Sequence, residues 1–210
     1  MKKNILSKNF HYNNILIELH PEVYEPAEDT FQLLESIEVN SEEKVLEIGT
    51  GCGVIALKCA SLGANVVCTD INPYAVELTK RNYIRNKSLI KGRFEVRKSD
   101  IFSAIKDNEK FDVIIFNPPY LPTKKNELFG RSGWFDISTD GGIDGLRLTK
   151  RFIDGLSKYL YNNGKAYFVF SSLSDIKKIN LYLFKNRLKG RIVSSYRFND
   201  ETIFVYLIYF

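Results

Sequence analysis

The sequence predicts a single doubly wound α/β domain, in which helices cover both faces of a parallel sheet and an antiparallel hairpin ends the chain. Three observations support this fold class. From residue 44 onward, short apolar segments of strand length alternate with segments of helical periodicity. The last two apolar segments are joined by a short polar turn without a helix. The chain has 210 residues, 44% of them hydrophobic, which suits one core of this kind.

The first part of the chain, residues 1–43, is expected to form a hairpin and a helix that precede a core of residues 44–210. Residues 5–20 predict the hairpin, because apolar positions flank a turn-favouring pair of asparagines. A helix is expected from about Ala27 to Ile37, where apolar residues recur at helical spacing. We expect no second domain.

The core is expected to alternate strands and helices until its final hairpin. Strands are expected at residues 44–48, 65–69, 93–98, 111–116 and 165–171, and the hairpin strands at 191–198 and 202–210. Helices are expected near residues 53–62, 73–86, 145–160 and 174–188. The long connection 117–144 is rich in proline, glycine and polar residues, and connections of that length are usually functional or disordered.

Charge and cysteine content exclude several classes of protein. The formal net charge of +5 is modest and by itself identifies no partner. No apolar run is long enough for a transmembrane helix, and Lys2 and Lys3 are not followed by the apolar core of a signal peptide. Cys52, Cys59 and Cys68 lack the spacing of a metal site. We therefore expect a cytoplasmic protein with reduced cysteines and no bound metal.

A glycine-rich turn, Gly49-Thr50-Gly51-Cys52-Gly53, follows the first core strand. Glycine allows the backbone to turn sharply and to approach a ligand closely. Asp70 ends the second core strand, where a carboxylate can accept hydrogen bonds from ribose hydroxyls. Together these features predict a site for a nucleoside-containing cofactor. A tight turn that binds nothing is the alternative for the glycines alone.

The same turn favours S-adenosylmethionine over NAD. The dinucleotide pattern G-x-G-x-x-G would have its third glycine at position 54, which is Val54. Glu47, one residue before the strand ends, would repel a pyrophosphate but attract an ammonium or sulfonium group. S-adenosylmethionine carries both cations and no phosphate. A structural ion pair is the alternative role for Glu47.

Two residues after the third core strand fit the adenine of such a cofactor. Asp100 can accept a hydrogen bond from the adenine amino group, and Ile101 can lie against the face of the ring. The alternative for Asp100 is an exposed cap of the next helix.

The segment Asn117-Pro118-Pro119-Tyr120 follows the fourth core strand. Its prolines cannot donate ladder hydrogen bonds, so the chain must leave the sheet at the edge where such folds bind ligands. The Asn117 and Pro118 carbonyl groups can accept both N–H bonds of a planar NH₂ group, while Tyr120 stacks on it. The segment thus predicts methyl transfer to an amide or exocyclic amino nitrogen. A rigid turn is the alternative.

At these motifs the sequence resembles class I methyltransferases that modify planar NH₂ groups. It is similar to the archaeal and eukaryotic glutamine methyltransferases of class 1 translation termination factors, which are related to bacterial release-factor methyltransferases. The resemblance extends from about Glu18 to Phe170. It rests on four stretches, at residues 23–31 (VYEPAEDTF), 46–54 (LEIGTGCGV), 69–73 (TDINP) and 116–120 (FNPPY).

The resemblance implies a Rossmann-like fold and methylation of a glutamine side-chain amide in the Gly-Gly-Gln loop of a termination (release) factor. It implies that Asn117 contacts both the cofactor and the substrate glutamine. The other cofactor contacts that it implies are Thr30, Glu47, Gly49, Gly51, Asp70, Asp100 and Ile101. For Thr30 the alternative is a first-turn residue that complements the helix dipole.

The resemblance also implies a small zinc-binding activator protein that adds to an edge of the sheet. Strand 93–98 is a candidate for that edge. Its charged residues Arg93, Arg97 and Lys98 are, however, of the kind that protects an edge from pairing. The sequence leaves this question open.

Two other functions remain open. Adenine-N6 methylation of DNA or RNA uses the same N-P-P-Y geometry, but extruding a base requires a sizeable basic and aromatic platform. The long connection offers a small one, made of Lys124, Lys125, Phe129, Arg131 and Trp134. The other function is a catalytically silent scaffold that binds the cofactor and activates a partner. The intact N-P-P-Y segment argues against it.

Overall fold

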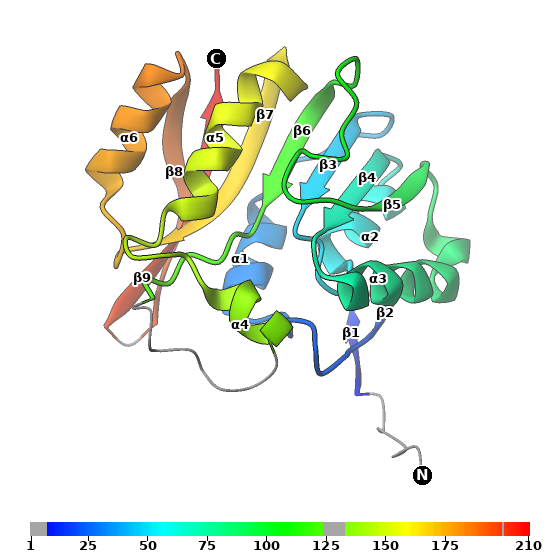
Figure 1. The fold of residues 1–210 in the computed structure, drawn as a ribbon. Helices are drawn as coiled ribbons and strands as arrows, with labels where there is room; N and C mark the ends of the chain where they lie inside the picture. The colour runs from blue at the N-terminus through cyan, green and yellow to red at the C-terminus, as the bar shows by residue number, and fades with distance from the viewer. Residues whose placement is uncertain (1–7, 124–132, 199) are drawn as a thin grey trace.

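The structure, a computed structural model, describes residues 8–123, 133–198 and 200–210 (Figure 1). The strands are β1 (Asn9–Tyr12), β2 (Ile15–Glu18), β3 (Lys44–Ile48), β4 (Asn65–Asp70), β5 (Phe94–Lys98), β6 (Phe111–Phe116), β7 (Leu160–Ser171), β8 (Lys189–Phe198) and β9 (Glu201–Tyr209). The helices are α1 (Glu28–Ser36), α2 (Val54–Ser61), α3 (Pro73–Arg85), α4 (Gly133–Thr139), α5 (Arg147–Tyr159) and α6 (Ile176–Lys185), with a 3₁₀ turn at Lys87–Leu89.

A mixed sheet forms the centre of the described part of the chain, with the strand order β5-β4-β3-β6-β7-β9-β8. Strands β3 to β7 run parallel, whereas β9 is antiparallel to both β7 and β8. The predicted fold class, a doubly wound sheet with a C-terminal antiparallel hairpin, is confirmed. Asn199, in the predicted hairpin turn, lies outside the described residues.

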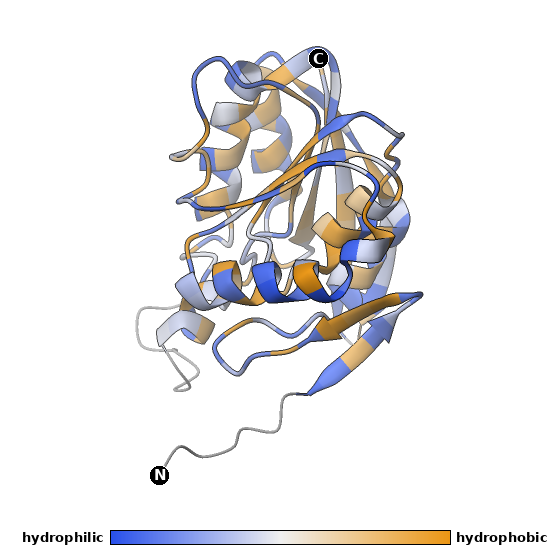
Figure 2. Ribbon diagram, turned by 90° about the vertical axis from the view of Figure 1, so that its right-hand side faces the viewer, coloured by the Kyte–Doolittle hydropathy of each residue, from blue (hydrophilic) through white to orange (hydrophobic). Residues whose placement is uncertain are grey.

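Each face of the sheet is covered by helices. Helices α1, α2 and α3 contribute to one hydrophobic cluster, while α5 and α6 contribute to the other. Successive side chains of β3 point to opposite faces of the sheet, so Val45 belongs to the first cluster and Leu46 to the second. Figure 2 shows both hydrophobic and hydrophilic residues on the helices, as expected for helices that cover a buried sheet. Among the described helices, none has the length and apolar character needed to cross a bilayer.

The N-terminal hairpin is attached to the core through two side-chain amides of the α3 region. The Asn86 amide exchanges hydrogen bonds with the Leu16 backbone, at 2.9 and 2.7 Å, and Asn82 Oδ1 accepts the Glu18 N–H at 2.9 Å. Both asparagines are buried. Residues 19–27, the N-terminal strap, then cross to the carboxyl edge of the sheet, where α1 begins. The hairpin thus fixes the path of the strap.

Two elements differ from the sequence-based expectation by more than three residues. Strand β7 begins at Leu160 rather than at residue 165, because the turn-like Asn162-Asn163-Gly164 segment is absorbed by a register shift against β6. Helix α4 lies within the connection that was expected to be irregular. It has only 7 residues, several of them aromatic or β-branched, so periodicity and propensity give little signal there.

Candidate active site

A cavity of about 180 Å³ lies at the carboxyl edge of the parallel strands. Its wall includes the segments that directly follow β3, β4, β5 and β6, together with parts of the N-terminal strap, α1 and α4. The structure therefore brings the predicted motifs to one place. All of the residues expected at the site line this cavity, namely Thr30, Glu47, Gly49, Gly51, Asp70, Asp100, Ile101, Asn117, Pro118, Pro119 and Tyr120.

The turn after β3 requires glycine at two of its positions. Gly49 and Gly53 have φ angles of +68° and +85°, in the left-handed region that side-chain-bearing residues rarely adopt. A Cβ atom on Gly53 would lie 2.8 Å from the Thr79 side chain, and one on Gly49 would lie 3.3 Å from the Phe116 ring. Glycine here therefore allows the close packing of the turn beside the cavity.

Asp70 connects the glycine turn with the end of β4. Its Oδ2 atom accepts the Gly51 N–H at 2.9 Å, and its Oδ1 atom accepts the Asn72 N–H at 2.9 Å. Burial raises the pKa of this carboxyl group, and the backbone donors oppose that shift. The carboxylate is thus held in a fixed orientation at the cavity wall, where we propose that it binds the ribose.

Glu47 lies beneath the turn with only 2% of its surface exposed. Its Oε2 atom accepts hydrogen bonds from the Thr50 hydroxyl, at 2.6 Å, and from the Ala56 N–H, at 3.1 Å. Burial raises its pKa to about 8. Its partners are neutral donors, so the structural ion pair considered for Glu47 is not formed with any residue that the structure describes.

The wall of the cavity is acidic. Four carboxyl groups line it, those of Asp29, Glu47, Asp70 and Asp100, and the described lining includes no lysine, arginine or histidine. Such a wall disfavours phosphate groups and favours a cation. This supports the choice of S-adenosylmethionine over NAD.

Asp29 is the centre of a hydrogen-bond network at the cavity, although we did not expect it among the site residues. Its Oδ1 atom accepts the Thr30 N–H at 2.6 Å and the Tyr24 hydroxyl at 3.3 Å. Its Oδ2 atom accepts from the Asn117 side-chain amide at 3.0 Å and from the Tyr120 hydroxyl at 3.3 Å. The carboxylate is 5% exposed. Asp29 therefore joins α1 to the segment that follows β6.

Asn117 has a fixed amide orientation because its nitrogen faces this carboxylate. The Asn117 Nδ2 atom also lies 3.4 Å from the Thr30 hydroxyl, while its Oδ1 atom is buried and has no hydrogen-bond partner among the described residues. A buried carbonyl oxygen without a donor is costly. An N–H group of a ligand is the kind of partner that this oxygen lacks.

The two phenols beside Asp29 remain protonated donors. Burial, with a further contribution from the Asp29 charge, raises the pKa of both Tyr24 and Tyr120 well above the usual range. Their hydroxyl groups can therefore donate to the carboxylate throughout the physiological pH range. The Tyr120 ring is in this way held at the cavity wall, where a stacking role is proposed for it.

The expected adenine end of the cavity contains Asp100 and Ile101. The Asp100 side chain is 46% exposed and forms an ion pair with Arg151, at 2.9 Å. No helix begins after Asp100, because residues 101–105 form turns, so the alternative role as a helix cap is wrong. Ile101 is buried and has a φ angle of +51°, which is rare for a β-branched residue.

The long connection contributes only partly to the described site. Trp134, on α4, lines the cavity. The other members of the small platform considered for a nucleic-acid substrate, Lys124, Lys125, Phe129 and Arg131, lie outside the described residues.

Comparison with known proteins identifies the family. The sequence profile of the methyltransferase small domain matches residues 26–130, half of the chain. A protein of Methanocaldococcus jannaschii, named as a candidate protein N5-glutamine methyltransferase, is 43% identical over 85% of this chain and 89% of its own length. This chain belongs to the methyltransferase small domain family.

Two further matches place the methyltransferase among its relatives. The structure of Encephalitozoon cuniculi Mtq2 in its complex with Trm112, described as responsible for methylating the termination factor eRF1, superposes with a TM-score of 0.67 at 24% identity; the match covers 90% of this chain and 98% of that one. A tRNA1(Val) adenine-N6 methyltransferase of a Flavobacteriaceae bacterium is 32% identical over 57% of this chain and 52% of its own length. The first supports the fold, and the second shows that related sequences modify adenine.

The cofactor of this methyltransferase is S-adenosylmethionine. The observed cavity fits it, because the acidic wall suits its two cationic groups and the positive-φ glycines leave room for close approach. The assignment of individual residues to its parts remains our proposal, with Glu47 beside the cationic end, Asp70 at the ribose and Ile101 at the adenine.

Raising the pH toward 8 should strengthen cofactor binding to the methyltransferase. Below its raised pKa of about 8, buried Glu47 is mostly protonated in the free protein. A nearby cation favours the ionised form, so binding releases a proton and the affinity rises with pH until Glu47 is already ionised. Calorimetry in two buffers of different ionisation enthalpy measures this proton release. Glu47→Gln should reduce it, whereas the exposed Glu77→Gln should not; unchanged release in Glu47→Gln would refute the assignment.

Proposed function

We propose that this methyltransferase modifies the side-chain amide of a glutamine in a protein, in the Gly-Gly-Gln loop of a class 1 translation termination factor. The observation that carries the proposal is the Asn117 side chain. Its nitrogen is held by Asp29 and its buried carbonyl oxygen lacks a donor, as expected for a group that receives an N–H from a planar NH₂ group.

The chemistry requires the substrate nitrogen to be oriented rather than deprotonated. The cofactor supplies an electrophilic methyl group. Asn117 Oδ1 and the Pro118 carbonyl accept the two N–H bonds of the substrate amide, so its nitrogen is presented with the lone pair free to attack. Positioning of this kind contributes at best about 7–11 kcal/mol. The proton can leave after transfer, and no general base is needed before it.

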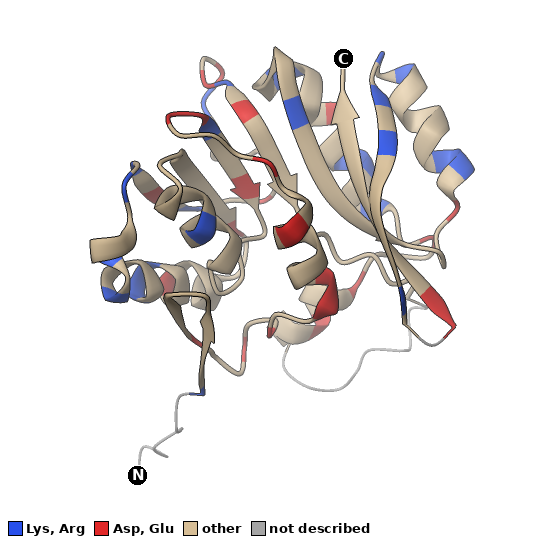
Figure 3. Cartoon of the chain, turned by 180° about the vertical axis from the view of Figure 1, so that it is seen from behind, with Lys and Arg blue, Asp and Glu red and all other residues tan. Residues whose placement is uncertain are grey.

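The charge near the cavity supports a protein substrate over a nucleic acid. Three basic side chains of α5, the helix that contributes Leu148 to the cavity wall, are already paired, in the ion pairs Arg147–Asp140, Lys150–Asp144 and Arg151–Asp100. Seen from behind, acidic residues mark α1, which lines the cavity, and the β8–β9 hairpin, whereas lysine and arginine mark β8 and α6, which contribute nothing to the described lining (Figure 3). Nucleic acids require unpaired basic groups for their phosphates. The relatives named for glutamine and for eRF1 point to the same class of substrate.

The partner is proposed by analogy with the Mtq2–Trm112 complex. A small activator subunit that adds a strand has two edges to choose from in the described sheet, β5 and β8. We favour β5, the edge that the family resemblance suggested, because the Arg97 guanidinium is paired with Glu95 and Glu109 and is only 15% exposed, so it presents no free charge along that edge. Zinc in that subunit is an expectation from family resemblance alone.

A labelling experiment tests the substrate. With a tritiated methyl donor, label should enter a recombinant termination factor, with or without a co-purified small subunit, and disappear when the loop glutamine is changed to asparagine. A termination factor with a glutamine changed elsewhere is the matched control. If label still enters the factor after the loop change, the methylated residue is not the loop glutamine. Label in RNA or DNA but not in protein would favour adenine-N6 methylation.

A further inference from the structure

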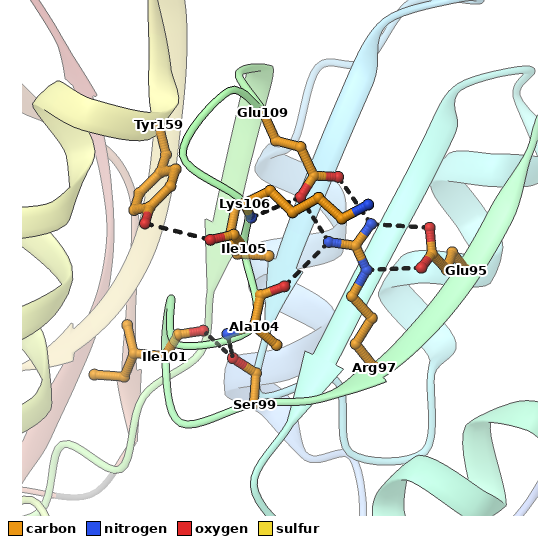
Figure 4. Close-up of polar contacts among 9 residues, drawn as sticks. All are labelled: Glu95, Arg97, Ser99, Ile101, Ala104, Ile105, Lys106, Glu109 and Tyr159. Atoms are coloured by element: carbon orange, nitrogen blue, oxygen red, sulfur yellow. Dashed lines mark hydrogen bonds and ion pairs between the residues drawn. The ribbon is translucent and has the colours of Figure 1, made fainter.

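The side chain of Arg97 joins the edge strand β5 to both halves of the loop that follows it, next to the proposed adenine end of the cavity (Figure 4). It pairs with Glu95 on the same edge strand, at 2.7 and 2.9 Å, and with Glu109 just before β6, at 2.8 Å twice. It also donates to the Ala104 carbonyl, at 3.2 Å, in the β5–β6 loop of residues 99–110. Every N–H group of the guanidinium therefore has an acceptor, and we call this network the Arg97 clamp.

The geometry of the Arg97 clamp is not that of a residue that merely protects an edge. Both carboxylates meet the guanidinium with two oxygens each, the strongest arrangement for such pairs. The side chain is 15% exposed, whereas Arg93, which directly precedes the same strand, is exposed to solvent. The Arg97 guanidinium lowers the pKa of Glu109 to about 2, so this carboxyl group of the clamp stays ionised at physiological pH.

Continuous hydrogen bonds lead from the clamp to Ile101. Ala104 accepts from Arg97 through its carbonyl, and its N–H donates to the Ser99 hydroxyl at 2.9 Å. That hydroxyl in turn donates to the Ile101 carbonyl at 3.0 Å. Ile101 has a φ angle of +51°, and a β-branched residue keeps such a conformation only where its surroundings impose it. The clamp and Ser99 provide these surroundings.

We propose that Arg97 is a positioning residue for the adenosine end of the cofactor. It acts through Ala104 and Ser99, which hold Ile101 in its left-handed conformation as part of the cavity wall. The proposal rests on the proposed function as a methyltransferase and on the proposed place of Ile101 against the adenine of its cofactor. Loss of the clamp lets the loop relax, and the wall against the adenine moves.

Calorimetry on the 210-residue chain tests this role with S-adenosylmethionine and with 5′-methylthioadenosine, which retains only the adenosine end. Arg97→Ala should weaken both ligands about tenfold, and Arg97→Lys by less. Arg93→Ala, which removes the same charge from the residue that precedes β5, is the matched control and should change neither. The Arg97→Ala enzyme should show a raised KM for the cofactor with kcat unchanged. If Arg97→Ala binds both ligands as tightly as Arg93→Ala does, the proposal is overturned.

A double-mutant cycle separates positioning from general loss of stability. Glycine adopts the φ angle of Ile101 without strain, so after Ile101→Gly the clamp has little left to hold. Arg97→Ala should therefore weaken binding far less in the Ile101→Gly background than in the wild type. If the two substitutions weaken binding independently, so that their fold-losses in affinity multiply in the double variant, the proposal is overturned. If Ile101→Gly alone leaves both ligands unaffected, the assignment of Ile101 to the adenine fails, which is a different result from failure of the clamp.

Discussion

Asn117→Ala should reduce methyl transfer by about 10²- to 10³-fold while the protein stays folded. The substitution removes the buried carbonyl oxygen that has no partner in the described chain, and with it one of the two acceptors proposed for the substrate NH₂ group. Little packing is lost, since Pro118 and the following residues still direct the chain out of the sheet. Single-turnover labelling at saturating cofactor measures the rate, and thermal unfolding checks the fold.

Asn186→Ala provides the control for this prediction. Its amide also forms hydrogen bonds, to Asp154 at 3.1 Å and to the Tyr182 carbonyl at 3.0 Å, but it lies at the end of α6 and does not line the cavity. The control should retain wild-type activity. Full activity in Asn117→Ala would mean that the side-chain amide does not hold the substrate, and the mechanism proposed above would have to be abandoned.

Asp29→Asn should lower kcat by about 10²-fold with a much smaller change in cofactor affinity. The variant keeps the shape of the side chain but removes the negative charge that keeps the Asn117 side-chain nitrogen turned toward residue 29. With an amide in both positions, Asn117 can rotate and present N–H groups where the substrate requires an acceptor. Steady-state kinetics separate the loss in kcat from any change in KM.

The neighbouring carboxylate offers a matched control for Asp29. Glu28 is exposed at the first turn of α1, so Glu28→Gln changes the same charge without touching the network. Its kcat should be close to that of the wild type. Equal losses in the two variants would show that Asp29 acts only through the overall charge of this region, and not by orienting Asn117.

Most of the core could be predicted from the sequence because its signals are local. Strands β3 and β6 begin and end where expected, since each is a short, mostly apolar segment that is followed by Gly49 or by Asn117-Pro118. The cavity was predictable for a topological reason: parallel strands end at one edge, so motifs far apart in the sequence meet there. By contrast, β7 runs through Asn162-Asn163-Gly164, and only its pairing with β6 reveals this.

The residues that sequence reasoning missed depend on long-range contacts. Asp29 looks like an ordinary acidic residue in the first turn of a helix, and its role becomes visible only when the N-terminal strap places it next to Asn117, 88 positions further along the chain. Arg97 resembles a protective charge on an edge strand until Glu109, 12 positions later, is seen to turn it inward. Periodicity and spacing carry no information about such pairings.

The acidic wall of the cavity has a consequence for turnover. Once the methyl group has left, the spent nucleoside, S-adenosylhomocysteine, carries one positive charge fewer, because its sulfur is a neutral thioether. The attraction of a wall carboxylate beside the sulfur, the role proposed for Glu47, therefore weakens at the moment when the product must depart. We expect this difference to favour exchange of used donor for fresh donor.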